Sequence, residues 1–232
     1  MIEEDGETAG FGGIEVEDEA TLVGPLVGPA FRGRKFGSTL LEASLDIARV
    51  EGVESLHASL GARNIGGRLL LERAGFRPHG SLDAVYRLLP GAHRRMEHPL
   101  GGVTTRQAGS DDVEAGLRLC HECLAGSRIS DATWRRGIER GEVRIAEEND
   151  VPVALVRIDP AHRRVFHGVT AGARARGLGG YVLSEALEAY WGEHPGETLR
   201  LTVPGGNLPA SRLYRRLGFA PWLVLQTFEL DL

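Results

Sequence analysis

The chain has 232 residues, of which 42% are hydrophobic and 25% are charged, and its formal net charge at pH 7 is −5. This length accommodates two domains of ordinary size, the composition is that of a soluble globular protein, and the acidic balance argues against a nucleic-acid or anionic-membrane partner. No stretch approaches the roughly 18 apolar residues of a membrane span, and the start MIEEDGE lacks the positive charge of a signal peptide, so a cytoplasmic protein is expected.

The N-terminal half begins with a short run of predicted strands. Upstream of a strand at residues 21–27 there is room for two strands, but not for a strand followed by two helices. The half ends at residues 90–102, PGAHRRMEHPLGG, whose proline, glycine and charged residues are typical of a linker.

The C-terminal half alternates between strands and helices. Alternating apolar residues predict strands at residues 103–106, 142–147, 152–158, 165–170, 199–203 and 228–232. A capping box of Asp111 and Glu114 predicts the first helix, and a short helix follows at residues 131–140. A loop and a long helix follow at residues 174–191. The last helix is capped by Asn207 at its start and ends near Gly218.

Two segments of the same design lie about 142 residues apart. Both contain an arginine, an asparagine and a Gly-Phe pair in that order: Arg32, Asn64, Gly75 and Phe76 in the first, and Arg174, Asn207, Gly218 and Phe219 in the second. Their period is too long for a solenoid unit and indicates duplicated domains. We therefore predict one domain at residues 1–92 and another at residues 103–232.

The run RARGLGG at residues 174–180 lies between a predicted strand and a predicted helix. Glycines let a ligand approach the backbone, and the free N–H groups and dipole of a helix N-terminus favour an anion. Arg174 and Arg176 add donors for phosphate oxygens. The run lacks the Lys-Ser/Thr pair of a triphosphate-binding loop and does not fit GxGxxG, so neither a kinase nor a dehydrogenase follows. An ordinary tight turn is the alternative.

The order R-x-x-G-x-G-G, strand, N-x-x-A-x-x-x-Y-x-x-x-G-F resembles the GNAT superfamily of acetyl-CoA-dependent N-acetyltransferases. The residues that carry the resemblance are Arg174, Gly177, Gly179, Gly180, Asn207, Ala210, Tyr214, Gly218 and Phe219. The resemblance extends from Val103 onward and implies an α/β (α+β) fold. Each of two tandem domains would be a mixed, mostly antiparallel sheet flanked by helices.

The resemblance also implies roles for single residues. The coenzyme A pyrophosphate would be held by the loop, with help from Asn207; the loop residues are Arg174, Arg176, Gly177, Leu178, Gly179 and Gly180. The strand edge at Val169 would pair with the pantetheine arm, and a backbone N–H there would stabilise an oxyanion. Tyr214 would protonate the departing thiolate as general acid. A core position on its helix is the alternative for Tyr214.

No residue stands out as the general base. His167 is a candidate because a neutral imidazole titrates near the working pH, while His162 and Asp159 are weaker candidates and a water relay is the other option. By the resemblance, the first two helices of this half border the acceptor pocket. The residues there that would contact an acceptor are Trp134, Arg135 and Arg136. The alternative is that the tryptophan is a core residue and the two arginines form a solvated basic face.

Cys120-His121-Glu122-Cys123 suggests a metal or redox site at first sight. Two cysteines are too few for a four-cysteine zinc site, and Cys120 falls on the apolar stripe of its predicted helix. We therefore expect no metal.

The first copy departs from the pattern at two positions. Lys35 stands where the second copy has Gly177, and Leu71 stands where it has Tyr214. The fold should survive and the chemistry should be lost, although residual coenzyme binding remains open. The missing first strand and helices should leave part of its sheet to be covered by the second domain or by another subunit.

The expected function is transfer of an acetyl group from acetyl-CoA to a primary amine, carried by the C-terminal domain. Alternatives are a non-catalytic acetyl-CoA sensor, a scaffold, and a mycothiol-synthase-like acetyltransferase. The acceptor, a small-molecule or peptide amine, cannot be read from the sequence, and a homodimer is compatible with it.

Overall fold

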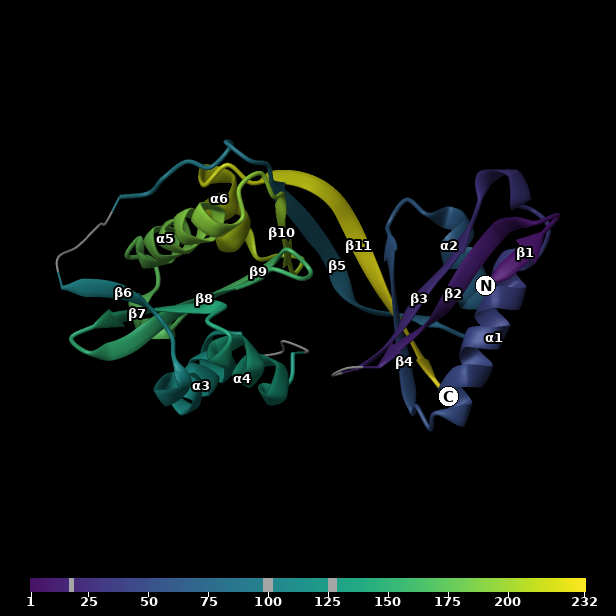
Figure 1. Cartoon of the computed structure of the whole chain (residues 1–232), viewed down its shortest axis with the longest axis horizontal. Helices are drawn as coiled ribbons and strands as arrows, with labels where there is room; N and C mark the ends of the chain where they lie inside the picture. Colours follow the sequence, from purple (N-terminus) through teal and green to yellow (C-terminus); the bar gives the residue numbers. More distant parts are fainter. Residues whose placement is uncertain (17–18, 98–101, 125–128) are drawn as a thin grey trace. The chain divides into compact units, whose positions relative to one another are not determined.

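The computed structural model describes the chain except for residues 17–18, 98–101 and 125–128 (Figure 1), so four residues of the predicted linker lie outside the described part. The chain divides into two compact units: unit 1 comprises residues 1–83 and 223–232, and unit 2 comprises residues 84–222. Both have the predicted mixed, mostly antiparallel sheet with flanking helices. Among the described helices, none is long and apolar enough to cross a bilayer.

Unit 1 orders its strands as β1 (Ile2–Glu4), β2 (Glu7–Val16), β3 (Ala20–Val27), β4 (Ser55–Gly61) and β11 (Ala220–Asp231). All these pairs are antiparallel except β3 with β4. Its helices are a 3-10 turn at Pro29–Phe31, α1 (Phe36–Val50) and α2 (Ile65–Arg73). Helically spaced apolar residues of α1, such as Leu41 and Leu45, pack with Leu56, Leu71 and Phe228 in one core.

Unit 2 orders its strands as β5 (Arg77–Leu88), β10 (Leu199–Val203), β9 (Arg164–Val169), β8 (Val151–Asp159), β7 (Val143–Glu148) and β6 (Val103–Gln107). Its helices are α3 (Val113–Cys123), α4 (Asp131–Glu139), α5 (Leu178–Glu193) and α6 (Leu208–Arg216), with 3-10 turns at Ser110–Asp112 and Ala171–Ala173. β8 is buried on both faces because α5 packs on one side and α3 on the other. In place of the predicted capping box of Asp111 and Glu114, the Asp112 carboxylate accepts a hydrogen bond from the Gly109 N–H at 2.8 Å.

The last strand of each repeat pairs with a strand of the other unit. β5 follows the first repeat, yet its residues 84–88 pair along the whole of β10 in unit 2, where Tyr86 and Leu88 are buried. β11 follows the second repeat, yet its residues 225–231 pair with β4 in unit 1, where Phe228 is buried. The compact units therefore differ from the predicted ranges 1–92 and 103–232, because the alternation of apolar residues predicts a strand but not its partner.

The face of β4 and β11 that is turned away from the unit 1 core carries polar side chains. Nδ1 of His79 lies 2.6 Å from Glu229, and the Ser59 and Thr227 hydroxyls are 3.3 Å apart. The described part of unit 1 contains α1 and α2 but no counterparts of α3 and α4. That the second domain or another subunit covers this face stays a prediction.

Replacing Phe228 by alanine removes a fully buried side chain that β11 contributes to the unit 1 core. We expect the free energy of unfolding of unit 1 to fall by about 3–5 kcal/mol. Hydrogen exchange followed by mass spectrometry should show lost protection in α1 and α2 but not in α5. Val224→Ala is the control, since this side chain of the same strand is 43% exposed. Equal losses in α1 and α5 would contradict the assignment of β11 to unit 1.

Candidate functional site

The sheet of unit 2 opens between β9 and β10. The two strands pair in parallel only at Arg164 and Arg200, close to the start of each. Their other edges are fully paired, β9 with β8 from Arg164 to Val169 and β10 with β5. The carboxyl-terminal part of β9 therefore presents free backbone groups toward β10, which an extended ligand can pair with.

The predicted anion loop leaves β9 at this opening. Arg174 donates from Nε to the Val169 carbonyl at 3.1 Å, which fixes the turn, and Gly177 caps α5 with φ of 80°. Ala175 also has a positive φ, of 60°. Because glycine adopts such angles without steric cost, the backbone conformation favours glycine at position 177.

Arg176 is already paired. Its Nη1 donates to Glu148 Oε2 at 2.8 Å, and Nη2 contacts the other carboxylate oxygen. This hydrogen bonding from Arg176 lowers the pKa of Glu148. The loop therefore presents Arg174 and the backbone N–H groups at the start of α5, while Arg176 braces the loop against the β7–β8 hairpin.

Two of the loop glycines are also closely packed. A Cβ atom at Gly179 would lie 2.9 Å from Cε1 of His167, and one at Gly180 would lie 2.4 Å from the sulfur of Met96. Met96 is held there because its backbone N–H donates to the buried Ser184 hydroxyl at 3.0 Å. The glycine pattern thus reflects close packing of α5, in addition to any ligand.

Tyr214 lies on α6, is 7% exposed, and faces His167 of β9. Its hydroxyl oxygen is 3.4 Å from Nδ1 of His167, and its ring also contacts Tyr86 and Phe219. Burial raises the pKa of Tyr214 and lowers the pKa of His167 to about 4, an effect that the backbone of Gly179 only partly offsets. Both side chains are neutral at pH 7.

Asn207 acts as a helix cap. Its side-chain oxygen accepts a hydrogen bond from the Ala210 N–H at 3.2 Å, as Asn64 does from Gly67 at 2.9 Å in unit 1. The predicted cap is confirmed. Gly218 ends α6 with φ of 99°, as predicted for a left-handed C-cap.

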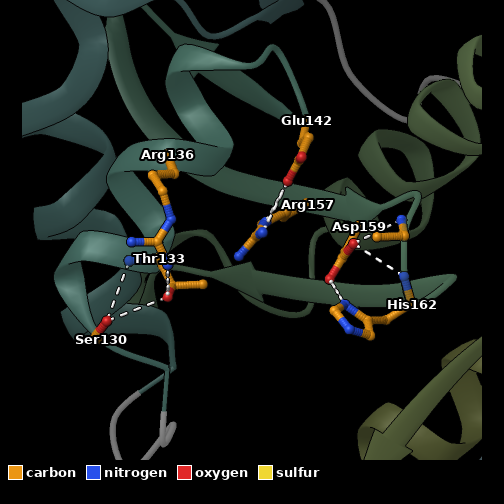
Figure 2. A network of polar contacts seen from close by, with 8 residues as sticks. Ser130, Thr133, Arg136, Glu142, Arg157, Asp159 and His162 are labelled. Carbon is orange, nitrogen blue, oxygen red and sulfur yellow. Dashed lines mark hydrogen bonds and ion pairs between the residues drawn. The ribbon is translucent and has the colours of Figure 1, made fainter. Parts of the chain in front are cut away.

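The weaker base candidates lie at the other end of β9. Nδ1 of His162 and the Asp159 carboxylate are joined by a hydrogen bond of 2.8 Å in the β8–β9 turn (Figure 2). The loop at residues 174–180 follows the opposite end of the strand, about 17 Å away at 3.3 Å per residue. The structure does not bring these two residues to Tyr214.

The residues near the predicted acceptor side mostly have structural partners. Trp134 is 2% exposed, Arg135 pairs with Glu114, and Arg136 donates to the Thr133 hydroxyl at 2.8 Å (Figure 2). Burial raises the pKa of Cys120 to about 12, so this thiol stays protonated. In the described ranges, no cluster of three metal-ligating side chains occurs.

Sequence reasoning missed a buried ion pair beneath α4. Arg157 of β8 donates from Nε and Nη2 to Glu142 at 3.0 and 2.9 Å (Figure 2). Its guanidinium also lies over the rings of Trp134 and Phe166, at 5.6 and 6.0 Å. The only signal for this pair was an arginine within the apolar run VALVRID.

Unit 1 repeats the loop without the phenol. Lys35 takes the left-handed conformation of Gly177, with φ of 66°, at a cost of about 1 kcal/mol. Arg32 donates to the Val27 carbonyl at 3.3 Å, just as Arg174 does to Val169. Leu71, in the position of Tyr214, is 2% exposed in the unit 1 core. The loop geometry is therefore retained where the tyrosine is absent.

One family model matches part of the chain. Residues 1–76 match the family model described as Acetyltransferase (GNAT) family. This match falls on the half of the chain that lacks the tyrosine. No curated protein matches the chain.

Several solved structures share the fold over nearly the whole chain. A GCN5-related N-acetyltransferase from Sphaerobacter thermophilus has a TM-score of 0.73 at 20% identity and covers 98% of this chain and 78% of its own. A tandem GNAT protein from the clavulanic acid biosynthesis pathway has a TM-score of 0.73 at 17% identity, with coverages of 99% and 81%. A GCN5-related N-acetyltransferase from Kribbella flavida has a TM-score of 0.68 at 22% identity, with coverages of 97% and 88%.

The buried His167 should make unit 2 sensitive to acid. Its folded-state pKa of about 4 lies below the ordinary 6.5, so its contribution to stability is undiminished above pH 6.5 and is lost as the pH falls toward 4. Between pH 7.5 and 5 we expect the wild type to lose about 2 kcal/mol more than His167→Asn.

Urea unfolding followed by tryptophan fluorescence measures this difference, because all three tryptophans lie in unit 2. His121→Asn, which changes an exposed imidazole, is the control. Parallel losses in the wild type and His167→Asn would refute the prediction.

Proposed function

We propose that the chain transfers an acetyl group from acetyl-CoA to a primary amine, with the reaction in unit 2; residues 1–76 match the GNAT acetyltransferase family model, and the fold is shared with GNAT N-acetyltransferases. The observation that carries the proposal is the buried Tyr214 hydroxyl beside β9, the strand whose edge opens toward β10. In unit 1 the corresponding residue is Leu71, which has no proton to give.

In this proposal, the loop binds one part of coenzyme A and the edge of β9 binds another. The pyrophosphate would bind the N–H groups of Gly177, Leu178, Gly179 and Gly180, with a charge-assisted hydrogen bond from Arg174. Arg176 would act mainly by bracing the loop, because its guanidinium is already hydrogen-bonded to Glu148. The pantetheine arm would pair with β9 near Val169.

In the reaction, the amine nitrogen attacks the thioester carbonyl carbon, the C–S bond breaks, and the sulfur takes the Tyr214 proton. A backbone N–H at the end of β9 would stabilise the intermediate oxyanion. His167 is a poor general base for the amine, because its pKa of about 4 makes it a weak proton acceptor. A water relay therefore suits the proton that leaves the nitrogen.

Calorimetric titration of acetyl-CoA into the full chain tests the binding site. We expect one site per chain, weakened about 10²-fold in Arg174→Ala/Arg176→Ala because charge-assisted hydrogen bonds and the loop brace are lost. The matched change in unit 1, Arg32→Ala/Arg34→Ala, should leave Kd unchanged. Two sites per chain, or weaker binding in the unit 1 variant, would place coenzyme binding in unit 1. If acetyl-CoA did not bind at all, the scaffold alternative would remain.

Thiol release from acetyl-CoA with a panel of small-molecule and peptide amines tests the chemistry. We expect Tyr214→Phe to lower kcat by about 10²- to 10⁴-fold with little change in coenzyme affinity, because only the proton donor is removed. Tyr181→Phe, which removes another phenol from unit 2, is the control. Equal rates in Tyr214→Phe and wild type would exclude Tyr214 as the acid, and binding without turnover would indicate a sensor.

A further inference from the structure

Two buried polar side chains meet between β9 and α6. The Tyr214 hydroxyl is 3.4 Å from Nδ1 of His167, and the rings are 6.1 Å apart and inclined at 75°. No other described side chain hydrogen-bonds to this hydroxyl. The phenol that we propose as the acid is therefore oriented by one neighbour.

The second ring nitrogen of His167 decides how the pair is protonated. Nε2 is buried and packs against Gly179, whose backbone partly offsets the lowering of the His167 pKa by burial, but no atom of the described residues meets Nε2 with hydrogen-bonding geometry. A neutral imidazole carries one N–H, and a buried donor without a partner is rarer and more costly than an acceptor in the same situation. The proton therefore belongs on Nδ1, where it faces the Tyr214 oxygen.

We propose that His167 is a positioning residue for Tyr214: its Nδ1–H donates to the phenolic oxygen and leaves the phenolic proton free for the departing sulfur. The inference rests on the proposed function. As the C–S bond breaks and the sulfur takes the proton, the phenolate oxygen keeps the hydrogen bond from Nδ1. The proton released by the attacking nitrogen reaches the phenolate through solvent, so His167 gains and loses no proton.

This arrangement favours proton transfer from a phenol that burial makes less acidic. A hydrogen bond donated to the charged form of a group stabilises that form, so the bond from Nδ1 counteracts the burial of Tyr214 as negative charge develops. The 3.4 Å separation is at the long end for a hydrogen bond, and such contacts shorten when the substrate is bound.

Two substitutions separate the Nδ1 donor from the rest of the ring. The amide nitrogen of asparagine is as many bonds from Cβ as Nδ1 of histidine, so His167→Asn can keep the donor to Tyr214. Phenylalanine keeps the ring but has no donor. Glutamine places its amide nitrogen at the distance of Nε2, so it fills the site with the donor in the wrong place.

Nuclear magnetic resonance tests the tautomer without any substrate. The full chain labelled with ¹⁵N-histidine should show, at pH 7, a neutral imidazole protonated at Nδ1 whose signals vanish in His167→Asn. Protonation at Nε2 overturns the proposal, whether or not the chain transfers acetyl groups. Protonation at Nδ1 in a wild-type chain that releases no thiol with any amine refutes the proposed function instead.

Kinetics with the best amine of the panel tests the positioning role. We expect His167→Phe and His167→Gln to lower kcat about tenfold, with KM for acetyl-CoA within about twofold and with activity restored to within about threefold of wild type in His167→Asn. In a Tyr214→Phe background, His167→Phe should cause no further loss. Additive losses, or no recovery in His167→Asn, would overturn the proposal.

Discussion

The pairing of β9 with β10 stops after a single residue pair, and the candidate site depends on that interruption. Backbone N–H and C=O groups left unpaired inside a sheet must find partners, so an opening of this kind is stable only when its far edges are held and a ligand or solvent enters it. Here β8 and β5 hold the far edges. The loop that follows Val169 and the Tyr214 hydroxyl both face β9, because each makes a polar contact with that strand.

Unit 1 repeats this backbone design without the tyrosine. In unit 1, β3 and β4 pair in parallel only at Ala20 and Thr21, and the loop that follows repeats the arginine contact to the preceding strand. The retained features are the ones that build the turn, and they lie within residues 1–76, the range that matches the family model. A proton donor depends on one side chain, so a single leucine is enough to remove it without disturbing the fold.

The local features of this structure could be predicted from the sequence, but few of its contacts between distant positions could. Element order, the Asn207 cap and the left-handed Gly218 follow from propensity and spacing, and all three are found. The Tyr214–His167 contact joins positions 47 residues apart, and Arg176 meets a carboxylate 28 residues upstream, so neither could be read from periodicity. The exchanged strands were missed for the same reason, since a strand pattern does not say which edge it will join.

The position of Phe228 bears on the order in which the protein is made. A ribosome releases unit 2 as one uninterrupted stretch, residues 84–222, whereas the core of unit 1 lacks its β11 strand until residues 223–232 have been synthesised. Domains usually fold in the order of synthesis, the N-terminal one first. Here that order is reversed, because the unit that is translated first completes its core last. Until β11 has been synthesised, β4 remains unpaired along one edge.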